Sequence, residues 1–111
     1  MNYDEMTPEE LNCVFHEAVL KRKKMNCHWV DEAGSIIRRR DAKPYTTSLH
    51  HVWPFVAACE IWNIDKCGPI WTAEVYCDKS YSPTFRSQSL PFALCVCLIK
   101  RAKRMATRGD E

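Results

Sequence analysis

Residues 70–77, Ile-Trp-Thr-Ala-Glu-Val-Tyr-Cys, decide the fold because apolar and polar side chains alternate along them. Every second side chain is apolar: Trp71, Ala73, Val75 and Cys77. Such alternation is typical of a β-strand with one buried face. A loop runs from Asp78 to Pro83, and residues 84–87, Thr-Phe-Arg-Ser, are predicted to form the partner strand.

One helix is predicted before this strand pair in the sequence, and another is predicted after it. The last helix begins at Ser89, an N-cap residue, and tolerates Pro91 in its first turn. One side of it is mainly apolar: Leu90, Leu94, Cys97, Leu98 and Arg101. The middle helix is predicted from Thr47 to Asn63, where Pro54 either bends the helix or marks its first turn.

The first helix has the strongest local signal. Thr7-Pro8-Glu9-Glu10 forms a capping box, and Met6 and Leu11 occupy the positions of a hydrophobic staple. An apolar stripe follows, His16 falls on the polar side, and residues 21–24 give the helix a basic end. A hairpin is predicted next, with strands at residues 27–30 and 35–40 around a turn that contains Gly34.

These elements define an α+β domain. The predicted order is α-β-β-α-β-β-α, with three helices and a short antiparallel sheet of about four strands. A chain of 111 residues corresponds to one domain. We expect an ordered core from Thr7 to Arg104 and fraying over residues 106–111.

Composition places the protein in a reducing cytoplasm. The acidic N-terminus does not resemble a secretory signal, and no apolar run is long enough to cross a membrane. Seven cysteines, an odd number without an export signal, are expected to be reduced thiols on apolar faces. A net charge of +2 is far below that of a dedicated nucleic-acid binder.

Several segments resemble a family of small α-β-α sandwich domains encoded by tailed phages and prophages. They are Pro44-Tyr45-Thr46-Thr47, Val52-Trp53, Trp71-Thr72-Ala73-Glu74 and Ser89-Leu90-Pro91-Phe92-Ala93-Leu94-Cys95. The similarity extends from about Trp29 to Lys100, and Pro54 departs from the common pattern. The resemblance implies a phage or prophage product that acts in the bacterial cytoplasm. It implies no reaction, because the family is functionally uncharacterised.

No motif for catalysis or a cofactor is present. Cys27-His28 and Cys95-x-Cys97 lack the spacing of structural zinc ligands, and there is no glycine-rich phosphate loop. We therefore expect no enzyme activity, no cofactor and no metal. A thiol- or metal-dependent enzyme remains the third hypothesis, since seven cysteines and four histidines share one small domain.

Three basic clusters bear on binding: residues 21–24, 38–40 and 100–104. The first and third are predicted to lie at helix C-termini, where cations are favoured whatever the function. Arg38 and Arg40 share one face of a strand, and with Trp29 and Tyr45 they could contact nucleic acid. A charged strand edge that prevents aggregation explains the arginines equally well.

A binding module for a host protein is the favoured hypothesis, and nucleic acid is the alternative partner. Aromatic side chains are common anchors in protein interfaces, and the chain has four Trp and four Tyr. The competing interpretation places Trp29, Trp53, Trp62 and Trp71 in the core. No membrane partner is expected, and the sequence does not indicate an oligomeric state.

Overall fold

A computed structural model describes residues 2–25, 28–38 and 42–109. Within these residues the α+β class is confirmed, with three α-helices and two three-stranded antiparallel sheets. The elements are η1 (Tyr3–Glu5), α1 (Pro8–Ala18), β1 (Lys23–Lys24), β2 (His28–Val30), β3 (Ile36–Arg38), α2 (Leu49–Ala57), β4 (Trp62–Cys67), β5 (Ile70–Val75), β6 (Thr84–Ser87) and α3 (Leu90–Gly109). The order is α-β-β-β-α-β-β-β-α, so each predicted strand pair gains a third strand.

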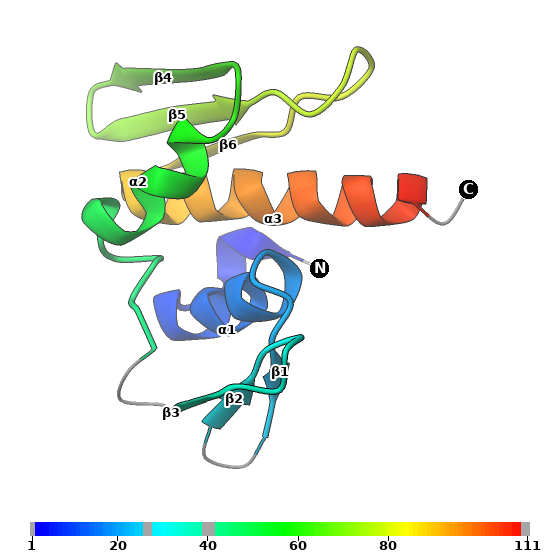
Figure 1. The fold of residues 1–111 in the computed structure, drawn as a ribbon. Coiled ribbons are helices and arrows are strands. Elements are labelled where there is room, and N and C mark those ends of the chain that lie inside the picture. The colour runs from blue at the N-terminus through cyan, green and yellow to red at the C-terminus, as the bar shows by residue number, and fades with distance from the viewer. Residues whose placement is uncertain (1, 26–27, 39–41, 110–111) are drawn as a thin grey trace.

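The fold is layered around α3, as Figure 1 shows. The sheet β4-β5-β6 lies on one side of α3, and α1 lies on the other, with the sheet β1-β2-β3 beyond α1. Because helices and a sheet cover it from opposite sides, α3 is buried all around from Phe92 to Ile99. The sequence predicted a single apolar side for this helix, whereas an apolar helix of this kind belongs in the centre of a domain.

The capping box at the start of α1 is confirmed. The Oγ1 atom of Thr7 accepts a hydrogen bond from the N–H of Glu10 at 3.2 Å. The Glu10 carboxylate accepts one from the N–H of Thr7 at 3.3 Å. Leu11 is fully buried and Met6 packs against the core, as the hydrophobic staple requires.

The end of the first helix differs from the prediction. α1 ends at Ala18, and the N–H groups of Val19 and Leu20 both donate to the carbonyl of Phe15. Lys21 then has a left-handed backbone, with φ at 53°. This turn redirects the chain, so Lys23–Lys24 form β1 beside β2 and are not a basic helix end.

The middle helix is also shorter than predicted. α2 covers Leu49–Ala57, with Pro54 inside it, past the first turn. The last turn tightens through a bond from the N–H of Cys59 to the carbonyl of Val56 at 3.0 Å. Residues 62 and 63, predicted as helix, belong to β4, because Trp62–Cys67 pairs with Ile70–Val75 across a Gly68-Pro69 turn. Gly68 has φ of 61°, as the first position of a two-residue hairpin turn requires.

The β2–β3 hairpin, β6 and the start of α3 agree closely with the prediction. The hairpin of β2 and β3 forms around residues 31–34, and Asp31 Oδ1 accepts bonds from the N–H groups of Ala33 and Ser35. β6 covers residues 84–87, and Ser89 caps α3. α3 includes residues 106–109, which the sequence assigned to a frayed tail. In the described part of the chain, no helix is long and apolar enough to cross a membrane.

Candidate functional site

The residues predicted to contact a partner do not form one exposed surface. Trp29 and Tyr45 are only 5% and 7% exposed, and both contribute to the interior. Arg38 lies on the exposed side of β3, opposite His28 in the register. Arg40 lies outside the described residues. A base could stack on Trp29 or Tyr45 only if that ring left the interior, so Arg38 has no accessible aromatic partner among these residues.

Trp29 is held in the interior by His16, a residue that the sequence placed on the polar side of α1. His16 is fully buried, and its ring stacks on Trp29 with centroids 4.8 Å apart and planes 13° apart. Nδ1 of His16 lies 2.8 Å from Nη1 of Arg22, so the imidazole accepts a bond from the guanidinium. Burial, reinforced by the charge of Arg22, lowers the pKa of His16 to about 4. His16 is therefore neutral at physiological pH and supports packing.

Three of the thiols, those of Cys59, Cys95 and Cys97, lie in buried surroundings that disfavour their activation. The cysteines within the described residues are free: Cys13, Cys59, Cys67, Cys77, Cys95 and Cys97. Burial raises the pKa of Cys59, Cys95 and Cys97, the last to about 12, and disfavours the nucleophilic thiolate. Sγ of Cys97 donates to the carbonyl of Ala73 at 3.2 Å, which ties α3 to β5.

Among the described residues, no metal-binding cluster is apparent either. Across residues 2–25, 28–38 and 42–109, no three His, Cys, Asp or Glu side chains are grouped to hold a metal ion. Cys27, half of the adjacent Cys-His pair in the sequence, lies outside these ranges.

An apolar groove lies where α1, α2 and α3 meet. Its volume is about 740 Å³, and it is lined by Ala18, Val19, Lys21, Pro54, Phe55, Ala58, Leu98, Arg101, Ala102, Met105 and Ala106. A neighbouring hollow of about 370 Å³ shares Ala18, Lys21, Ala102 and Ala106 with it and adds Val14, Glu17 and Lys103. The two hollows therefore form one surface, which we call the three-helix groove.

The groove is open because small or rigid residues line it. Ala18 on α1, Ala58 at the end of α2, and Ala102 and Ala106 on α3 leave space between the backbones, and Pro54 and Ala58 are exposed. Met105 is 48% exposed and contributes apolar surface to the groove. Lys21 and Arg101 place positive charge within this apolar lining. Nε of Arg101 donates to the carbonyl of Tyr76 at 3.0 Å, which fixes this side chain.

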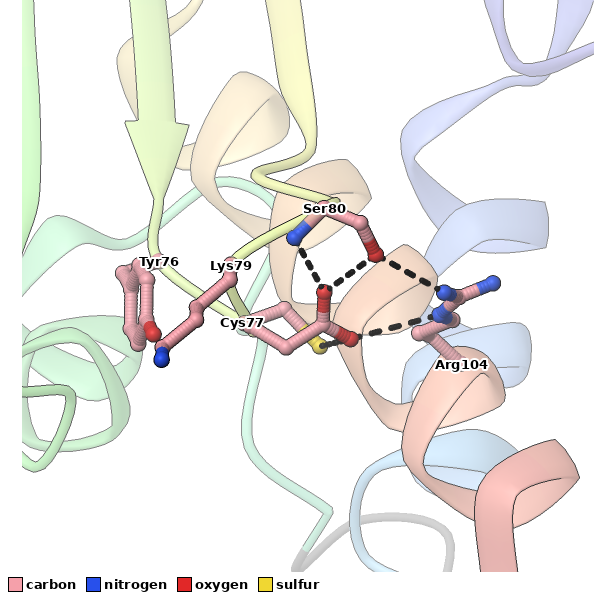
Figure 2. Close-up of a pocket in the computed structure, with 6 residues that line it drawn as sticks. Tyr76, Cys77, Lys79, Ser80 and Arg104 are labelled. Carbon is pink, nitrogen blue, oxygen red and sulfur yellow. Dashed lines mark hydrogen bonds and ion pairs between the residues drawn. The ribbon is translucent and has the colours of Figure 1, made fainter.

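A second hollow, of about 490 Å³, lies between the β5–β6 loop and α3 (Figure 2). Asp78 Oδ1 accepts bonds from the N–H and the hydroxyl of Ser80, both at 2.9 Å. Asp78 Oδ2 pairs with Nε of Arg104 at 3.3 Å, and Nη2 of Arg104 donates to the Ser80 hydroxyl at 3.2 Å. These bonds lower the pKa of Asp78, with Ser80 the main cause. The network joins the loop to α3 and fixes Arg104 in place.

Sequence reasoning missed the three-helix groove. The groove depends on the ends of α1 and α2, and both ends were placed wrongly. A usable signal was the spacing of Leu98, Ala102, Met105 and Ala106, which lie on one side of a helix.

The fold and the sites define a class: a small α+β domain with two antiparallel sheets, a central helix between one sheet and α1, and an apolar interhelical groove. In comparisons with known proteins, no family model matches the chain, and no curated protein does. A similar solved structure is the crystal structure of a phage protein from Bacillus cereus ATCC 14579. The two chains are 13% identical, the match covers 89% of this chain and 95% of that chain, and the TM-score is 0.71. At this identity, the similarity shows a shared fold.

Proposed function

We propose that the chain is a phage- or prophage-encoded accessory protein that binds a host protein in the bacterial cytoplasm and catalyses no reaction. Two observations support the proposal. The fold matches that of a phage protein over nearly the whole length of both chains. The three-helix groove is the observation that carries the binding function, because it exposes apolar side chains from α1, α2 and α3 together.

The chemistry of the groove selects its occupant. Apolar side chains such as Phe55, Leu98 and Met105 favour the apolar face of a partner segment. Lys21 and Arg101 lie among them, and Glu17 is the carboxylate among the described residues that line the neighbouring hollow. Charge complementarity therefore favours a segment of the host protein that carries acidic residues beside its apolar ones.

The buried thiols support a non-catalytic role. Catalysis by cysteine needs a thiolate near a base, whereas burial raises the pKa of Cys59, Cys95 and Cys97. His16 is the fully buried histidine, and its Nδ1 atom already contacts Arg22.

Two substitutions one residue apart test the groove. Ala58, directly after the end of α2, lines it, whereas Ala57, the last residue of α2, is exposed and does not line it. Tagged wild-type, A58E and A57E proteins are used to recover partners from a bacterial lysate, which are quantified by mass spectrometry. We expect a host protein whose recovery is unchanged by A57E and reduced at least tenfold by A58E, because a carboxylate fills the groove and repels an acidic segment. Circular dichroism is the control that checks whether both variants are folded.

Crosslinking identifies the bound segment. Lys21 is exposed and carries an amine for a lysine-to-carboxylate crosslinker. We expect crosslinks from Lys21 to a segment with both apolar and acidic residues. Equal recovery by A58E and A57E, or a crosslinked segment that is basic, would contradict the proposal.

A further inference from the structure

The strand β4 lies at an open edge of its sheet. The described strands of this sheet are ordered β4-β5-β6, so β4 has a strand neighbour on one side only (Figure 1). Its 6 residues pair with β5 in one continuous register, from Trp62↔Val75 to Cys67↔Ile70. Proline, a bulge or a very short strand usually protects such an edge from pairing with another chain. β4 has none of these features, so its outer side can accept another strand.

One hydrogen bond shows which backbone groups of β4 point outward. The N–H of Tyr76 donates to the carbonyl of Ile61 at 2.8 Å, and this bond continues the β4–β5 register by one pair. In an antiparallel ladder, pairs that bond to each other alternate with pairs that do not. The odd-numbered residues of β4 therefore bond to β5. The outward N–H and C=O groups belong to the alternate residues: Trp62, Ile64 and Lys66.

The side chains of β4 leave this edge open. Trp62 is 42% exposed and contacts Trp53 of α2 edge-on, with ring centroids 5.0 Å apart. Nζ of Lys66 lies 5.0 Å from the ring centroid of Trp71 on β5, so this lysine leans over its own sheet. Ile64 is half-buried and packs against the core. Pairing through the backbone groups leaves all three contacts in place.

We propose that β4 pairs antiparallel with β4 of a second copy of this chain, which gives a two-fold dimer with one sheet continuous across both copies. Outward backbone groups must pair with outward groups, and the register centred on Ile64 uses all of them. In this register Ile64 lies opposite Ile64 of the second copy. Trp62 then lies opposite Lys66, and Asn63 lies opposite Asp65.

The sequence of β4 is complementary to itself in this register. Like charges directly opposite each other would oppose self-pairing. Here the carboxylate of Asp65 faces the amide of Asn63, which can donate hydrogen bonds to it, and the cation of Lys66 faces an uncharged ring. Ile61, 60% exposed directly before the strand, adds apolar surface beside the pairing. A second copy is therefore the occupant that this edge favours.

The dimer edge is separate from the surface to which we assign the host protein. The described lining of the three-helix groove comes from elements other than β4. Dimerisation through β4 therefore leaves the groove accessible, and the two proposals can fail independently.

Amide hydrogen exchange followed by NMR on the full chain tests the pairing at single residues. We expect the N–H groups of Trp62, Ile64 and Lys66 to exchange at least tenfold more slowly at high protein concentration than at low concentration. The N–H groups of Asn63 and Asp65, which already bond to β5, should change far less. Sedimentation equilibrium over the same concentrations should show a monomer–dimer equilibrium.

A residue swap is the matched control. Asn63→Asp places a carboxylate opposite Asp65 at two symmetric positions, so we expect the dimer to dissociate about tenfold more readily. The double variant Asn63→Asp, Asp65→Asn has the wild-type composition and again places a carboxylate opposite an amide, so its dimer should regain the wild-type affinity. Repulsion within one chain, between the carboxylate introduced at position 63 and Glu74 opposite it on β5, would persist in the double variant.

Three results would each overturn the proposal. They are a monomer at every concentration, slower exchange confined to residues outside β4, and a double variant that dimerises as weakly as Asn63→Asp. Circular dichroism checks that both variants are folded, and the exchange measurement on the wild-type chain depends on neither of them.

Discussion

His16 shows how a single buried residue couples the interior to pH. Its ring stacks on Trp29 and meets the ring of Tyr45 edge-on, with centroids 5.4 Å apart. Its Nδ1 atom accepts a bond from Arg22, and that bond requires an unprotonated Nδ1. Protonation would place a second positive charge beside the guanidinium in a buried site. The folded state therefore binds the proton on His16 more weakly than the unfolded state does.

We expect stability to fall as the pH decreases from about 6.5 to about 4. The unfolded chain takes up the proton near the ordinary pKa of 6.5, whereas the folded chain does so only near 4. The unfolded state thus binds more protons in this window, so the free energy of unfolding rises with pH and is lost as the pH falls. The full effect is about 3 kcal/mol, measured by urea denaturation at a series of pH values.

Two variants separate His16 from the other histidines. His16→Gln should flatten the pH dependence between 6.5 and 4, whereas His50→Gln, at an exposed position of α2, should leave it unchanged. NMR titration of the wild-type imidazoles gives an independent measurement. A His16 ring that protonates near pH 6.5 in the folded protein would show that the explanation is wrong.

Among the elements, the β4–β5 hairpin depends on the backbone conformation of Gly68. Gly68 has φ of 61°, and a Cβ atom added there would meet nothing within 4 Å. A side chain at this position therefore has room, and its cost is conformational. Six residue pairs, from Trp62↔Val75 to Cys67↔Ile70, depend on this turn for their register.

Gly68→Ala should destabilise the protein by about 1–2 kcal/mol, because a left-handed backbone is strained for residues with a Cβ atom. The control is Asn63→Ala on the exposed side of β4, which should change stability by less than about 0.5 kcal/mol. Urea denaturation of both variants gives the comparison. Equal stability of Gly68→Ala and the wild type would mean that this turn does not set the register.

Elements with a local chemical signal could be predicted from the sequence, and elements that depend on distant partners could not. The capping box at Thr7 and the alternation of residues 70–77 require only neighbours in the chain. β1 is a strand of two lysines, and it exists because the left-handed Lys21 brings it beside β2. β4 was hidden because Trp62 and Asn63 continue the helical pattern of α2, and only pairing with β5 shows that they are extended.

At the scale of the whole molecule, the central position of α3 creates the binding surfaces. One part of this helix is buried between a sheet and α1, while its later turns project past α2 and expose Met105 and Ala106 (Figure 1). The three-helix groove forms where α1 and α2 end against these turns. The aromatic anchors expected at the surface, Trp29 and Tyr45, instead complete the interior. Burial of this kind depends on the packing of whole layers, so the candidate site was far less predictable than the fold.

Photo-crosslinking in bacterial cells tests most directly whether the three-helix groove is the surface that binds a host protein. Benzoylphenylalanine replaces Ala58, which lines the groove, or Asp65, which is exposed on β4 away from it. We predict a discrete adduct from position 58, weakened by Lys21→Glu, with crosslinked host peptides that contain apolar and acidic residues, and no matching adduct from position 65. The same adducts from both positions, or none from position 58, would contradict binding through the groove.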